Sequence, residues 1–171
     1  DTRAHAVMLR ACHAAAVIAL LGGGGTACHH QAHAAAVAPA PSDSLVGIVS
    51  VVGTSFEQRV MLRSGDYASS LALSSADSAA LSRVGAAEVV VRGVKGDVFR
   101  VSTFEVRRVD GAPVADGIVA RDGDRLALDT QRGRLALGNP PAALDSLVGA
   151  RIWVSGPLDV GPNSYGIIVP R

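Results

Sequence analysis

The chain has 171 residues, of which 49% are hydrophobic and 18% charged, and its formal net charge is +1. So balanced a charge excludes a broad electrostatic field that would attract nucleic acid or anionic lipid. All 5 histidines and both cysteines lie at or before His33. Because the chain from Ala34 onward has neither residue, imidazole- or thiolate-dependent catalysis, metal sites built from those ligands, and disulfides are excluded there.

The N-terminal residues have the pattern of an export signal. A basic start around Met8-Leu9-Arg10 precedes the apolar run Ala14–Leu21, and small residues follow as far as Cys28. A basic region, a short apolar region and a small-residue exit are typical of a secretory signal peptide. The run is too short to span a bilayer, which needs roughly 20 apolar residues. We expect a signal peptide over residues 1–27, within which Met8 is a plausible start methionine.

Gly25-Thr26-Ala27-Cys28 resembles the lipobox of bacterial lipoproteins, although Gly25 replaces the usual leucine. The resemblance implies that Cys28 is lipidated and anchors the protein to a bacterial membrane. The alternative is cleavage after Ala34, because Ala32-His33-Ala34 satisfies the A-x-A rule and would release a soluble periplasmic or secreted protein. Residues 28–43 are rich in Ala, Pro and Ser and are predicted to be a disordered tether. The histidines in this tether could also be interpreted as a metal-binding tract.

Beyond residue 43 the sequence repeats itself at an offset of about 64 to 70 residues. Three pieces recur in the same order. They are Gly47-Ile48-Val49 with Gly117-Ile118-Val119, Leu71-Ala72-Leu73 with Leu135-Ala136-Leu137, and Val84–Gly93 with Val148–Gly156. The pattern predicts one supersecondary unit used twice, over residues 44–111 and 112–171, with residues 110–116 as a short linker.

Within the first unit, apolar alternation predicts strands over 45–52, 58–63 and around 71–73. A short helix is expected from an N-cap at Ser75 to a stop at Gly85. Two further strands, 88–92 and 98–108, close the unit.

The second unit predicts the same order, with its helix between an N-cap at Asn139, followed by Pro140, and a stop at Gly149. Its last strands are expected over 151–155 and 165–169.

Three strands, a helix and two strands are the order of the OB-fold, a five-stranded Greek-key barrel. The chain resembles the short OB-type domains of exported bacterial proteins. This resemblance implies an all-β fold with two short helices, made of two tandem OB-fold-like five-stranded barrels. The rival architecture is a single larger sandwich or barrel made from all ten predicted strands.

Two sets of residues are candidates for a site. Arg59, Arg63 and Tyr67 lie on or beside the second strand, on the face that OB-folds use for ligands, where they could bind an anionic glycan or an oligonucleotide. The alternative for these three is a solvated strand face. Asp110, Asp116, Asp122 and Asp124 are interpreted as turn residues in preference to a calcium loop. Trp153 is expected in the core or between the units.

Taken together, these patterns predict a non-enzymatic, exported or membrane-anchored binding module of the bacterial envelope, with an envelope protein as its expected partner. No cofactor and no metal are expected, and nucleic acid is not an expected partner. A ligand-binding role through Arg59, Arg63 and Tyr67 is the first alternative. A carboxylate-based hydrolase is the second, because carboxylates are the only general bases beyond the tether.

Overall fold

The computed structural model describes residues 43–54 and 57–171, all of which belong to one compact unit. The predicted signal peptide, Cys28 and the tether as far as residue 42 lie outside the described residues. Within the described ranges, no helix combines the length and apolar character needed to cross a membrane.

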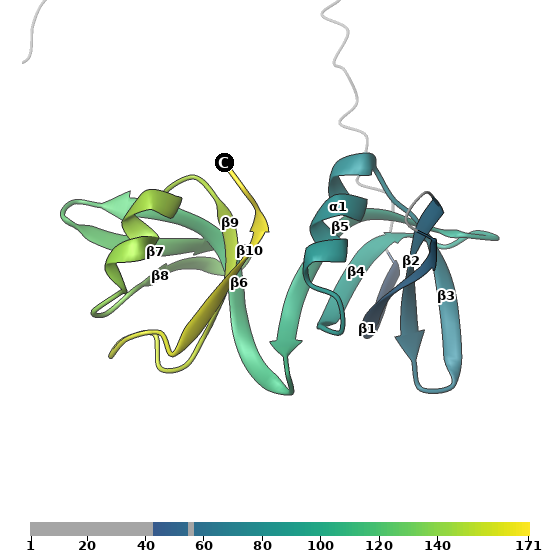
Figure 1. The fold of residues 1–171 in the computed structure, drawn as a ribbon, viewed down its shortest axis with the longest axis horizontal. Coiled ribbons are helices and arrows are strands. Elements are labelled where there is room, and N and C mark those ends of the chain that lie inside the picture. Colours follow the sequence, from purple (N-terminus) through teal and green to yellow (C-terminus); the bar gives the residue numbers. More distant parts are fainter. Residues whose placement is uncertain (1–42, 55–56) are drawn as a thin grey trace, which may run out of the picture. The chain divides into compact units, whose positions relative to one another are not determined.

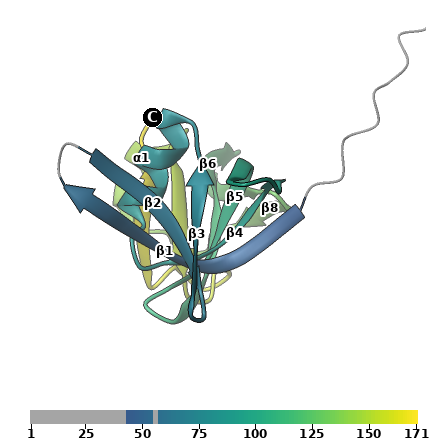
Figure 2. The same cartoon turned by 90° about the vertical axis from the view of Figure 1, so that its right-hand side faces the viewer.

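The first half, residues 43–111, is a closed barrel of five strands with one helix. Its elements are β1 (Asp43–Thr54), β2 (Glu57–Ser64), β3 (Tyr67–Ala72), α1 (Ser75–Arg83), β4 (Glu88–Val94) and β5 (Phe99–Val109). β1 pairs with β2 and β4, β2 pairs with β3, and β4 pairs with β5, all antiparallel. A short parallel pairing of β3 with β5, at Leu71 and Phe99, closes the circle. α1 lies toward the top of this barrel in both Figure 1 and Figure 2, and Figure 2 shows β1, β2 and β3 nearest the viewer.

The second half, residues 112–171, has the same order of elements but is closed differently. It contains β6 (Ala112–Asp122), β7 (Arg125–Thr130), β8 (Gly133–Ala136), the 3-10 helix η1 (Ala142–Leu147), β9 (Arg151–Ser155) and β10 (Ser164–Val169). Its strands follow the order β10-β9-β6-β7-β8, and in the described structure β8 and β10 do not pair. A backbone hydrogen bond from Gly138 N to Leu158 O, at 2.6 Å, instead connects the loop after β8 with the loop after β9. The all-β fold with two short helices is confirmed, and the closed five-stranded barrel is present in the first half.

The two halves share a set of equivalent backbone hydrogen bonds next to their helices. They are Val49 N to Ala87 O at 2.9 Å and Ala86 N to Val49 O at 2.9 Å in the first half, and Val119 N to Ala150 O at 3.0 Å and Gly149 N to Val119 O at 2.9 Å in the second. These bonds agree with the matching pieces of sequence. The tandem repeat itself stays a prediction.

The ends of α1 differ from the expected positions by one residue. The N-cap is Ser74 and not Ser75, because the Ser74 hydroxyl oxygen accepts a hydrogen bond from Asp77 N at 3.1 Å. At the other end the left-handed residue is Ala86, with φ of 66°, and not Gly85. A non-glycine residue in this region is strained, because its Cβ lies too close to the backbone.

The second helix is shorter than predicted and is not capped by Asn139. Asn139 has φ of 35°, and its side-chain amide donates to Val160 O at 3.1 Å, so it fixes the loop before β10. The helix starts only at Ala142, after Pro141, and is a 3-10 helix. Its expected stop, Gly149, does take a left-handed conformation, with φ of 90°.

Each half has its own hydrophobic core, yet one side chain from the last strand joins the core of the first half. Ile168 of β10 is fully buried within the cluster that contains Leu81 and Val49. The pairing of β10 with β9 shifts register between Ile167 and Val169, and such a bulge redirects a side chain. Trp153 packs against the same cluster, so its predicted role in packing is confirmed.

Replacing Ala86 with Gly should raise the free energy of unfolding by about 0.5–1 kcal/mol. Relief of the left-handed strain outweighs the extra backbone entropy that glycine loses on folding. The matched variant Gly149→Ala should lower it by about 1–2 kcal/mol, because an added Cβ would meet no atom within 4 Å and only the backbone conformation opposes it. Urea denaturation of both variants measures the two effects. A loss of stability in Ala86→Gly would contradict the strained left-handed conformation of Ala86.

Candidate functional site

The structure does not bring the predicted site residues together. Arg59 and Arg63 alternate with the buried Val60 and Leu62, so both arginines point out of the barrel from β2. Tyr67 stands opposite Ser64 in the β2–β3 ladder, which places it on the other face of the hairpin from Arg63. Arg59 and Tyr67 line separate shallow hollows, and Tyr67 is 81% exposed. The β2–β3 face therefore offers no convergent group of side chains.

A more convergent set of polar side chains lies where the two halves meet. A groove of about 470 Å³ is bordered by β5, by the first part of β6 and by the β7–β8 turn. It is lined by Glu88, Glu105, Arg107, Arg108, Pro113, Val114, Ala115, Asp116, Thr130, Arg132 and Leu135.

The groove exists because β5 and β6 separate soon after their common turn. Only Arg108 with Pro113 and Val109 with Ala112 are paired between them. The turn residues Asp110 and Gly111 both have positive φ, as a two-residue type I′ hairpin requires. The stretch from residue 110 to 116, expected to be a linker, is thus a tight turn followed by the start of β6. Asp110, Asp122 and Asp124 lie at turns or strand ends, as predicted.

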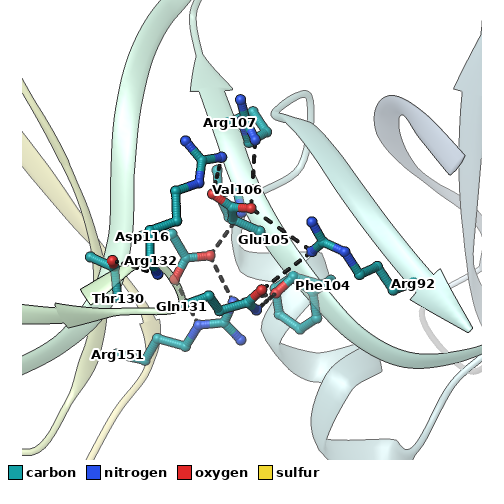
Figure 3. A network of polar contacts seen from close by, with 10 residues as sticks. All are labelled: Arg92, Phe104, Glu105, Val106, Arg107, Asp116, Thr130, Gln131, Arg132 and Arg151. Atoms are coloured by element: carbon teal, nitrogen blue, oxygen red, sulfur yellow. Dashed lines mark hydrogen bonds and ion pairs between the residues drawn. The ribbon is translucent and has the colours of Figure 1, made fainter. Parts of the chain in front are cut away.

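Asp116 was predicted to be a turn residue, and this is wrong. It lies within β6, and its side chain is only 2% exposed. Its carboxylate accepts hydrogen bonds from Val106 N at 2.8 Å and from Arg151 Nε and Nη2, each at 2.7 Å. Arg151, on β9, also donates from Nη2 to Phe104 O at 2.6 Å, and its guanidinium lies 4.2 Å from the centre of the Phe104 ring. Side chains of the second half thus bind the edge of β5 where its pairing with β6 has stopped (Figure 3).

Three arginines surround Glu105, which points to the outer side of β5. Its side chain is 12% exposed and lies 2.9 Å from Arg132 Nη2, 3.6 Å from Arg107 Nη1 and 4.0 Å from Arg92 Nη1. The arginines come from three different elements, β4, β5 and the β7–β8 turn (Figure 3). One carboxylate thus holds guanidinium groups from both halves.

The β7–β8 turn reaches this cluster in a fixed conformation. Thr130 Oγ1 accepts from Arg132 N at 3.1 Å and donates to Gly133 O at 2.7 Å. Behind the turn, Arg134 forms a two-point bond to Asp129, at 2.6 and 2.9 Å. The hydrogen bond from Arg134 lowers the pKa of the Asp129 carboxyl below its ordinary value. The hairpin therefore presents Gln131 and Arg132 to the first half.

Sequence reasoning missed Glu105, Arg107, Arg132 and the Asp116–Arg151 pair. Convergence of side chains from β4, β5 and the β7–β8 turn leaves no local pattern, since each arginine sits among ordinary strand or turn residues. A signal for Asp116 did exist. When the two halves are aligned at the offset of 70 that relates Gly47 to Gly117, Asp116 is equivalent to Val46. The second half thus has a carboxylate at a position where the first half has an apolar strand residue.

Among the residues that the structure describes, no group of three or more His, Cys, Asp or Glu side chains could hold a metal ion. Comparison with known proteins gave no match: no protein-family profile, no curated protein and no solved structure matches the chain. The resemblance to exported OB-type proteins stays a prediction.

Replacing Arg151 with Met should lower the free energy of unfolding by about 3–5 kcal/mol, because Asp116 would be left buried without its charge partner. The matched control is Arg121→Met, which removes an ion pair to Asp145 whose two side chains are each 54% exposed. That change should cost less than about 1 kcal/mol. Chemical denaturation gives both values. In the double variant Asp116→Leu with Arg151→Met, the loss should be smaller than the sum of the single losses, and an additive result would contradict the coupling.

Proposed function

We propose that this chain is a non-enzymatic binding module of the bacterial envelope and that it binds its partner in the groove between β5, β6 and the β7–β8 turn. The export pattern around Cys28 supports the location, with lipidation at Cys28, or release after Ala34, as the two modes. The observation that carries the proposal is the convergence of charged side chains from both halves on this groove.

The groove has the qualities of a binding site formed in advance. Its floor is fixed by the hydrogen bonds of Asp116 and Arg151, and its rim by the bonds of Thr130 within the β7–β8 turn. Fixed side chains lose little conformational entropy when a ligand arrives, which favours affinity. The apolar side chains of Pro113, Val114 and Leu135 provide surface for an uncharged part of the ligand beside the charged cluster.

The same contacts favour binding over catalysis. A general base needs a carboxylate that is free to accept a proton from a substrate. Asp116 already accepts hydrogen bonds from Arg151 and Val106, and Glu105 is in contact with three arginines. Glu88, the third carboxylate of the groove, lies 3.8 Å from Arg108, so the hydrolase alternative is less favoured. Binding through Arg59, Arg63 and Tyr67 is less favoured, because these residues do not converge.

The outer face of β1 is the rival location for a partner. Val46, Ile48 and Val52 alternate on that face and are each between 45 and 49% exposed. Exposed apolar side chains in a row can form a protein contact. An experiment on binding must therefore distinguish the groove from this sheet face.

A photo-crosslinking amino acid at Leu135, on the rim of the groove, should trap a partner when the full-length protein is irradiated in its own envelope. Leu135 is 39% exposed, so the label is accessible. The same label at Ile48 tests the β1 face, and at Val160, 63% exposed in the loop before β10, it gives the background. We expect a discrete adduct, identified by mass spectrometry, from position 135 alone. An adduct from Ile48 alone, or none above background, would overturn the proposal.

A further inference from the structure

The cluster around Glu105 carries more positive charge than its own carboxylate can neutralise. Arg92, Arg107 and Arg132 all have an ion contact to Glu105. The neighbouring charges are already paired, Asp116 with Arg151 and Glu88 with Arg108. A formal surplus of two positive charges is thus concentrated around Glu105, where Arg107 and Arg132 line the groove and Arg92 lies beside it. Surplus charge in a partly enclosed site is screened less than charge on an open surface.

We propose that this surplus binds an oxyanion of the ligand, a carboxylate or phosphate group, through Arg107 and Arg132 in the groove, with Arg92 beside them. The inference rests on the proposed function of the groove as a binding site, and it specifies the chemistry of the ligand. It also moves anion recognition from the β2–β3 face to the junction of the two halves.

The three guanidinium groups have N–H donors to spare. Arg132 donates one hydrogen bond to Glu105, and Arg92 donates one to Gln131. Arg107 contacts Glu105 at 3.6 Å, which is too long for a hydrogen bond. Each guanidinium carries several N–H groups in a planar fork that fits two oxygens of a carboxylate or phosphate. An incoming oxyanion would therefore find free donors from β4, β5 and the β7–β8 turn.

Glu105 would act as a built-in competitor for these donors. Its side chain is 12% exposed, so it stays within the cluster and holds the arginines close together in the absence of ligand. Without it, three like charges would repel one another. Its negative charge opposes an anionic ligand, so it should limit affinity. The carboxylate thus organises the site and weakens it. A glutamine at this position keeps an oxygen that can accept from the arginines, so we expect the loss of the competing charge to be the larger effect.

The test is an NMR titration of the purified full-length protein with inorganic phosphate and, separately, with acetate. The two probes distinguish a phosphate from a carboxylate preference. We expect saturable shifts of groove amides with at least one probe, and weakening of about tenfold in Arg107→Gln, since one charge-assisted contact is lost. Glu105→Gln, which removes the competing charge and keeps the side-chain shape, should bind several-fold more tightly. Binding should weaken as salt is added.

Arg59→Gln is the matched control, because it removes the same charge from an exposed position on β2 outside the groove. It should leave the affinity unchanged. Thermal unfolding of each variant checks the fold. If Arg107→Gln fails to fold, Arg107→Lys takes its place in the test. It keeps the charge without the planar fork, so its affinity should be lower than that of the unchanged protein but higher than without the charge.

Weaker binding in Glu105→Gln, or an equal loss in Arg59→Gln and Arg107→Gln, would overturn the proposal. So would the absence of saturable binding of either probe. If that absence came with an intact crosslink from position 135, the groove would remain the binding site and only its anionic ligand would be excluded. Loss of the crosslink with phosphate or acetate binding retained would instead contradict the envelope partner.

Discussion

Asp116 and Arg151, paired with each other, bind the second half of this protein to the edge of β5. β5 and β6 share only two paired positions, so their backbones cannot hold the halves together by a ladder. Instead, the buried Asp116 carboxylate accepts a hydrogen bond from Val106 N, and the Arg151 guanidinium donates one to Phe104 O, both on β5. Burial of the pair is tolerated because its polar groups are satisfied. The same two side chains fix the floor of the groove, so the geometry of the candidate site depends on a contact that also maintains the fold.

Local patterns were sufficient to predict most of the strands and the turns at Asp110 and Asp124, whereas the closed first barrel was expected from the resemblance to OB-type domains. Alternation of apolar residues, as in Val60 and Leu62, depends on only a few neighbours along the chain and transfers directly to structure. The helix ends were predicted less well. Ser74 and Ser75 are equally good caps by type, and Asn139 suits both an N-cap and a left-handed loop position. For Asn139, a tertiary contact favours the loop position, because its side-chain amide donates a hydrogen bond to Val160 O.

The candidate site could not be predicted because it is made of residues that are close only in space. Arg92, Glu105 and Arg132 come from strands and a turn far apart in sequence, and their meeting depends on how far β6 bends away from β5. A site was predicted on the β2–β3 face because its residues are close in sequence, and a pattern in the sequence reveals only such neighbours. Even there, the period of two separates Arg63 from Tyr67 across the hairpin. In this chain, nearness in sequence predicted the strands but not which polar side chains converge.

Ile168 has a consequence for how the chain acquires its structure. It comes from the last described strand, yet it completes the core beneath α1, and Arg83 donates to its carbonyl oxygen from 85 residues away. Until β10 is in place, the core that contains Leu81 lacks the Ile168 side chain, and Arg83 lacks its acceptor on β10. Contacts of such long sequence separation slow folding. The first barrel therefore gains its last core side chain only when the C-terminal strand is in place, so its folding is coupled to that of the second half.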